Sequence, residues 1–168
     1  MKRHERCSIG GSSGTEAESK QRICLVAIDG SKHADIALQW FKDNAWREGD
    51  HVLLVHTLDH KHTMAYGSVA MMPGNPDALA QQFRGEEKRA EQVMETFKQK
   101  CIDIGMPADI LKAYGDAGEA IVRTAHEKGV DMIICGCRGL GTIRRTIMGS
   151  VSDYIVHHAD APVIICKH

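Results

Sequence analysis

The chain has 168 residues, a length typical of one domain with a single core. Hydrophobic residues make up 43% and charged residues 26%, which is typical of a globular protein and excludes a fibrous or wholly disordered chain. The formal net charge is −1, so no basic surface indicates binding to nucleic acid or to a membrane. No apolar run approaches the roughly 20 residues of a membrane span.

The amino-terminal segment differs in composition from the rest. Residues 1–20 are rich in serine, glycine and charge and predict a flexible tail, either a regulatory arm or a dispensable one, ahead of a folded domain over 21–168. No apolar stretch follows Met1, so no secretory signal is expected. Cys24, Cys135 and Cys166 lie in apolar runs and are expected to be buried thiols, which favours a reducing, cytoplasmic location.

The first part of the domain predicts two strands and a helix. An apolar run over residues 23–28 ends at Asp29-Gly30 and predicts a buried strand. Ser31 is a suitable N-cap for a helix with apolar positions at Ile36, Ala37, Trp40, Phe41 and Ala45. Residues 51–58 predict a second strand. A loop to Gly74 follows, and it is either a partner surface or a cover over a ligand.

The second part continues the alternation. Pro76 opens a long helix that stops at residues 105–107, and 108–114 predict a third strand. Asp116 caps a helix that ends at Gly129. A fourth strand over 130–136, a helix from near Ser150 and a fifth strand over 162–166 follow. Strands alternating with helices predict a Rossmann-like α/β fold, an open parallel sheet with helices on both faces, whose ligands lie at the carboxyl ends of strands.

A glycine-rich segment over 136–152 joins the fourth strand to the next helix. Gly136, Gly139 and Gly149 allow backbone N–H groups to approach an anion, and the helix N-terminus adds its dipole. Hydroxyls of Ser150 and Ser152 would add donors, and Arg138 would add charge. The segment predicts a phosphate cradle, although a tight turn with a helix cap needs similar glycines. It is neither a dinucleotide fingerprint after the first strand nor a P-loop.

The spacing Gly136-x-x-Gly139, nine residues, Gly149-Ser150 fits G-2x-G-9x-G-[S/T], and here the chain resembles the ATP-binding universal stress protein family. Residues 26–31, 54–57, 129–136 and 149–163 are similar to further segments of that family in the same order. The resemblance covers about residues 22–167. It implies the strand order 3-2-1-4-5 and an adenine nucleotide, ATP or AMP, with or without magnesium.

The resemblance also implies the residues that bind the nucleotide. Asp29 would face the adenine or ribose side with Ala27 and Ile28 nearby, and Thr57 would hold adenine through its backbone. Gly136, Arg138 and Gly139 would line the ribose-phosphate path, with Cys135 where the family usually has a bulky apolar residue. The residues that would close over the phosphates are Gly149, Ser150, Val151 and Ser152.

The activity expected from this resemblance is that of a regulator or sensor in stress response, occupied by a nucleotide. The alternatives are a slow magnesium-dependent ATP hydrolase and a protein-binding dimer without a nucleotide. No carboxylate lies between Gly136 and Ser152, which disfavours the hydrolase, and no catalytic residue is assigned. The apolar final strand would form an edge, so we expect a homodimer through it, which the resemblance also implies. An unknown protein partner is left open; nucleic acid and membrane are not expected.

Two smaller patterns carry weaker expectations. His60 and His62 would suit a metal but are more simply part of a solvated loop, so no metal site is expected. Cys137 is expected in an exposed loop beside Arg138, where it would be either an inert thiol or one with a lowered pKa.

Overall fold

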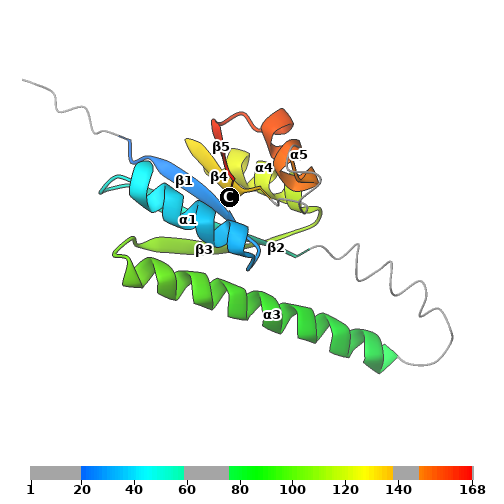
Figure 1. Cartoon of the computed structure of the whole chain (residues 1–168). Helices are drawn as coiled ribbons and strands as arrows, with labels where there is room; N and C mark the ends of the chain where they lie inside the picture. Colours follow the sequence, from blue (N-terminus) through cyan, green and yellow to red (C-terminus); the bar gives the residue numbers. More distant parts are fainter. Residues whose placement is uncertain (1–19, 59–75, 138–147, 168) are drawn as a thin grey trace, which may run out of the picture.

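The structure is a computed structural model, and it describes residues 20–58, 76–137 and 148–167. Strands and helices alternate along these ranges (Figure 1). The strands are β1 (Ile23–Ile28), β2 (His51–Leu58), β3 (Ala108–Tyr114), β4 (Met132–Gly136) and β5 (Val163–Cys166). The helices are α1 (Lys32–Asn44), α3 (Pro76–Asp103), α4 (Ala117–Lys128) and α5 (Ser150–His158).

The five strands form one parallel sheet in the order β3-β2-β1-β4-β5, which confirms both the expected fold class and the strand order. On one side β1 pairs with β2, beginning at Ile23 opposite His51. On the other side β1 pairs with β4, with Cys24 opposite Met132. The chain therefore adds β2 and β3 on one side of β1 and then crosses over to add β4 and β5 on the other side. The strand order reverses between the carboxyl ends of β1 and β4, which is where open α/β sheets bind ligands in a crevice.

Two apolar layers cover the sheet. In β1, Cys24, Val26 and Ile28 pack in one apolar layer with residues of α1 and α3, whereas Leu25 packs in the other with residues of α4 and α5. A strand covered on both faces needs apolar residues at successive positions, which explains the continuous run in the sequence. The five cysteines in the described ranges are all buried free thiols, as expected for Cys24, Cys135 and Cys166. Within these ranges no helix combines the length and the apolar character that a membrane span requires.

The helix caps follow the sequence. Ser31 Oγ accepts a hydrogen bond from the Ala34 N–H at 3.3 Å, and Asp116 caps α4 by accepting from the Gly118 N–H at 3.1 Å. The C-cap of α4 is Gly129, whose φ of 60° is in the left-handed region.

Two details of the expected elements were wrong. Trp40 is 38% exposed, and Leu38 is buried in its place on the face that α1 shares with Ala34 and Phe41. The fourth strand begins at Met132 rather than at Val130. The Val130 N–H still bonds to the Ala125 carbonyl of α4 at 3.0 Å, so that residue belongs to the helix end.

Candidate functional site

The turn after β1 forms one side of the crevice. The Ser31 N–H donates to Asp29 Oδ1 at 2.9 Å, so the Asp29 carboxylate lies against the start of α1. Gly30 has φ of 77°, which only glycine adopts readily, and a Cβ there would lie 2.9 Å from Val93 of α3. The turn is therefore fixed from two directions, and the exposed Asp29 stands at the carboxyl end of β1.

The end of β4 lies directly against the first turn of α1. A Cβ on Gly136 would lie 2.5 Å from the carbonyl oxygen of His33 and 2.6 Å from its carbonyl carbon. The contact is with backbone, which cannot rotate away as a side chain could. The sequence argument explained Gly136 by approach of a ligand; the structure shows that packing of α1 on β4 by itself requires a glycine there.

The N-terminus of α5 forms the other side of the crevice. Gly149 is its N-cap and provides no side-chain cap, and the Asp153 N–H bonds to the Gly149 carbonyl at 2.9 Å. The first three N–H groups of such a helix, here those of Ser150, Val151 and Ser152, have no acceptor within the helix. They carry the positive end of the helix dipole, so this end of α5 suits an anion.

A hydrogen bond joins α5 to β4. Ser152 Oγ donates to the Gly136 carbonyl at 3.1 Å, and Ser152 is only 4% exposed. This bond holds the N-terminus of α5 beside the end of β4. It also uses the Ser152 hydroxyl proton, so Ser152 would donate to a phosphate through its backbone N–H. Ser150 and Val151 are exposed at the same helix end.

Two cysteines near the crevice are buried. Burial raises the pKa of Cys135 to about 11. The thiol is therefore neutral at pH 7 and is not a nucleophile. The expectation of an exposed Cys137 was wrong. Its N–H donates to the Cys166 carbonyl at 2.9 Å, because pairing with β5 continues one residue beyond β4, and its side chain is buried.

The end of β2 is tied to the end of β1 by a residue that the sequence analysis missed. His56 Nδ1 lies 2.9 Å from the Ile28 carbonyl. A carbonyl only accepts, so Nδ1 carries a proton and donates it to this bond. His56 directly precedes Thr57, a half-buried residue that pairs with Ala113 of β3. His56 pairs with Ile28 in the register of β1 and β2, and this pairing was the only signal that could have identified it.

The structure thus brings most of the predicted residues to one edge of the sheet. Ala27, half buried, and Ile28, buried, end β1 and lead to Asp29, and Thr57 lies on the neighbouring strand. The residues contributed by β4 and α5 are Cys135, Gly136, Gly149, Ser150, Val151 and Ser152. Arg138 and Gly139 lie outside the described residues, as do His60 and His62. In the described ranges, no three His, Cys, Asp or Glu side chains gather as metal ligands would.

The class of protein follows from this geometry: an open, doubly wound α/β domain whose crevice carries an uncapped helix N-terminus suited to an anion. The sequence matches the model of the universal stress protein family over residues 21–167, and the chain belongs to that family.

Individual relatives agree with the family match. A universal stress protein of Thermus aquaticus is 34% identical over 151 residues, covering 87% of this chain and 98% of the relative. The solved structure of protein MJ0577 has a TM-score of 0.70 at 24% identity, covering 88% of this chain and 96% of that one. An Arabidopsis thaliana family member, solved with AMP bound, has a TM-score of 0.62 at 20% identity, covering 88% and 92%. A universal stress protein in complex with cAMP has a TM-score of 0.63 at 16% identity, covering 86% and 96%.

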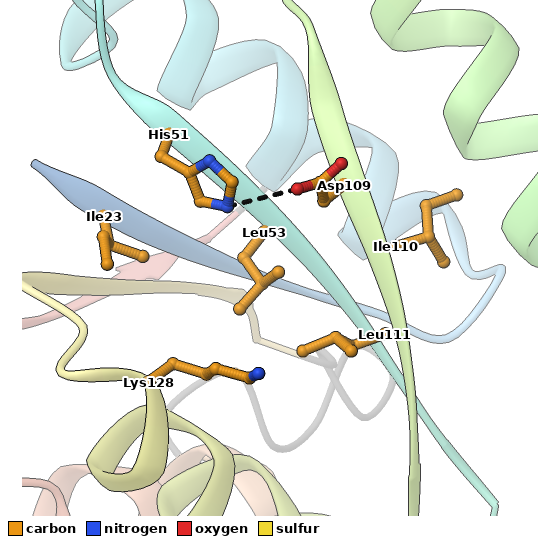
Figure 2. A pocket seen from close by; sticks show the side chains of 7 residues that line it. All are labelled: Ile23, His51, Leu53, Asp109, Ile110, Leu111 and Lys128. Atoms are coloured by element: carbon orange, nitrogen blue, oxygen red, sulfur yellow. Dashed lines mark ion pairs between the residues drawn. The ribbon is translucent and has the colours of Figure 1, made fainter. Parts of the chain in front are cut away.

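A cavity of about 290 Å³ lies at the opposite edge of the sheet (Figure 2). It is lined by residues near the amino ends of β1, β2 and β3 and by the last residue of α4. β1 has six residues, so the two edges are separated by roughly 16 Å at about 3.3 Å per residue. The cavity is therefore separate from the crevice described above.

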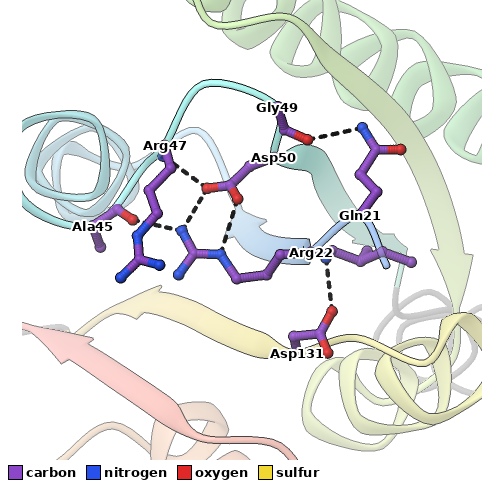
Figure 3. Close-up of polar contacts among 8 residues, drawn as sticks. Gln21, Arg22, Ala45, Arg47, Gly49, Asp50 and Asp131 are labelled. Carbon is purple, nitrogen blue, oxygen red and sulfur yellow. Dashed lines mark hydrogen bonds and ion pairs between the residues drawn. The ribbon is translucent and has the colours of Figure 1, made fainter. Parts of the chain in front are cut away.

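A charged network also lies at this amino edge (Figure 3). Arg22 donates to both carboxylate oxygens of Asp50, at 2.9 and 2.5 Å, and to the Ala45 carbonyl at 2.8 Å. The Arg47 N–H donates to Asp50 at 2.8 Å, and Asp131 accepts from the Ile23 N–H at 2.8 Å. Burial would raise the pKa of Asp50, but its hydrogen bonds from Arg22 and Arg47 outweigh that effect and lower it. These contacts hold the start of β1, the end of α1 and the start of β4 together.

Proposed function

We propose that this chain binds an adenine nucleotide, ATP or AMP, in the crevice between β1 and β4 and acts in stress response as a nucleotide-occupied regulator or sensor. The observation that carries the proposal is the hydrogen bond from Ser152 to Gly136. It fixes the uncapped N-terminus of α5 at the point where strand order reverses, beside the first turn of α1. Phosphate groups are the ligands that such a helix end attracts in an α/β sheet.

Family membership supports adenine as the base. The Arabidopsis thaliana relative binds AMP and another family member binds cAMP, and both have the fold of this chain. In the proposed complex the N–H groups of Ser150, Val151 and Ser152 donate to phosphate oxygens, with Gly149 giving them room. Gly136, Arg138 and Gly139 follow the ribose and phosphates, beside the backbone of Cys135.

The adenosine end would lie on β1 and β2. Asp29, held by the Ser31 N–H through one oxygen, presents its exposed carboxylate to the ribose hydroxyls, with Ala27 and Ile28 beside the base. Thr57 offers its backbone to adenine. His56 positions Thr57 because its bond to the Ile28 carbonyl fixes β2 against β1. Magnesium, where it takes part, would bind through the phosphates.

The proposal includes a cytoplasmic homodimer. β5 is an edge strand, and an edge strand presents unpaired N–H and C=O groups that a second copy can bond. Antiparallel pairing of two β5 strands about a two-fold axis would remove both edges. A partner protein would then bind the dimer according to which nucleotide the dimer holds.

Thermal unfolding with ATP, AMP and GTP, each with and without magnesium, tests this function. The protein is first shown to be free of copurified nucleotide. A ligand at ~100 times its dissociation constant adds about 2.7 kcal/mol to the free energy of unfolding. At roughly 2–4 °C per kcal/mol, the midpoint rises by about 5–11 °C with AMP or ATP. No shift with either, or an equal shift with GTP, contradicts the proposal; magnesium-dependent release of ADP would favour the hydrolase instead.

A further inference from the structure

The cavity at the amino edge of the sheet has an apolar floor. Ile23, Leu53 and Leu111 come from three adjacent strands, and all belong to the apolar layer on the α4 side of the sheet (Figure 2). Leu53 is buried, whereas Ile23 and Leu111 are half-buried. The floor is therefore partly accessible to solvent.

The hollow follows from the course of the chain. α4 begins after the carboxyl end of β3 and ends at Lys128, immediately before β4. On this face of the sheet, the last residue of α4, Lys128, lies at the side of a hollow over the amino ends of β1, β2 and β3. The remaining space is about 290 Å³, just below the roughly 300–1,000 Å³ typical of small-molecule sites.

The rim carries opposite charges on opposite sides. His51 Nε2 lies 3.3 Å from Asp109 Oδ2 on one side. Lys128 extends from the end of α4 on the other side, toward Leu111 (Figure 2). Among the described residues, Lys128 has neither an ion-pair partner nor a hydrogen-bond partner for its ammonium. Asp109 and Lys128 thus place one negative and one positive side chain on the rim.

We propose that this cavity binds a free amino acid with a branched aliphatic side chain, of about the size of leucine. The ligand carboxylate pairs with Lys128, its ammonium pairs with the Asp109 carboxylate, and its side chain covers the apolar floor. Asp109 can accept a hydrogen bond from the ligand ammonium because its side chain is 71% exposed. Its Oδ2 lies near His51, which leaves Oδ1 for the ligand. A ligand with only one charge would leave one side of the rim unused.

The test is an amide NMR titration of the full chain with L-leucine. A ligand with about nine non-hydrogen atoms is expected to bind with a dissociation constant on the order of a millimolar. We expect shifts confined to residues 23, 51–53, 109–111 and 128, with weaker effects from glycine, isopentylamine and 4-methyl-2-oxopentanoate. Glycine lacks the aliphatic body, and the other two each lack one charge.

Three variants decide the assignment. Lys128→Gln and Asp109→Asn each remove one charge from an exposed position, so both are expected to fold and to weaken leucine binding about tenfold. Lys98→Gln removes an exposed lysine from α3, on the other face of the sheet, and should bind leucine like the wild type. All three should keep the same thermal response to AMP. The proposal is refuted if leucine shifts no cavity resonance at about 10 mM, if the singly charged analogues bind equally well, or if Lys98→Gln weakens binding as much as Lys128→Gln.

Discussion

Replacing Gly136 by alanine tests the packing that shapes the crevice. The added Cβ would lie 2.5 Å from the His33 carbonyl oxygen, where ordinary contact begins at 3.4 Å. The first turn of α1 must therefore move by about 0.9 Å. Overpacking of this kind costs about 1–3 kcal/mol, and a backbone neighbour places this case at the upper end. Alanine recovers about 0.5–1 kcal/mol of chain entropy, so the net loss is about 2 kcal/mol.

Gly85→Ala is the matched control. Gly85 lies in α3 with no atom within 4 Å of an added Cβ, so the same change should stabilise the protein by about 0.5–1 kcal/mol. Urea unfolding of both variants measures the difference, expected near 3 kcal/mol. Because α1 carries the turn at Asp29, Gly136→Ala should also bind AMP more weakly. A Gly136→Ala protein within about 0.5 kcal/mol of the wild type would refute the close contact with α1.

Three further predictions concern the rest of the molecule. The pKa of Asp50 is lower in the folded protein than in the unfolded chain, where it is near 4. The ion pair of Asp50 with Arg22 therefore stabilises the fold fully at pH values above about 4. This contribution is lost as the pH falls through the folded-state pKa. Asp50→Asn should therefore cost about 2–3 kcal/mol in urea unfolding at pH 7 and much less at pH 2.5; an equal cost at both would contradict this. The carbonyls of Pro162 and Cys166 accept hydrogen bonds from Ile133 and Cys137, so the N–H of Ile165 points to the free edge of β5. Ile165→Pro removes this N–H without breaking a bond to β4, and light scattering should therefore detect a folded monomer. If that variant is still a dimer, the dimer does not form through β5. Burial raises the pKa of both Cys24 and Cys101 to about 11, so a disulfide reagent should modify them in native protein at pH 8 far more slowly than in urea; similar rates would be inconsistent with their burial.

The regular elements could be predicted because their signals are local. Continuous apolar runs mark strands covered on both faces, and residues such as Ser31, Asp116 and Gly129 mark helix ends through bonds to their own neighbours. Trp40 was misplaced because its sequence spacing fits the apolar stripe, whereas only the packed helix shows that Leu38 occupies the interior.

Fewer features of the site could be predicted from the sequence, because they depend on contacts between segments that are far apart along the chain. Nothing near Cys137 in the sequence reveals its bond to Cys166, so its burial was missed. Likewise, the glycine pattern predicted the approach of an anion at Gly136, whereas the structure shows that the backbone of His33 leaves no room for a side chain there. Such contacts can be predicted only when the pairing of the strands is known residue by residue.

Calorimetric titration of two Ser150 variants with AMP tests the central proposal most directly. Ser150 is the first residue of α5, where proline is favoured, and Gly149 before it is extended at φ −63° and ψ 148°, as a residue before proline prefers. Ser150→Pro therefore removes one backbone N–H from the anion site while keeping the helix, and Ser150→Ala removes only the hydroxyl.

We expect Ser150→Pro to weaken AMP binding at least tenfold, since a charge-assisted hydrogen bond is worth about 1.5–3 kcal/mol. Ser150→Ala should weaken it much less, and both should unfold near the wild-type temperature. AMP binding to Ser150→Pro with wild-type affinity would show that the N-terminus of α5 does not hold the phosphate.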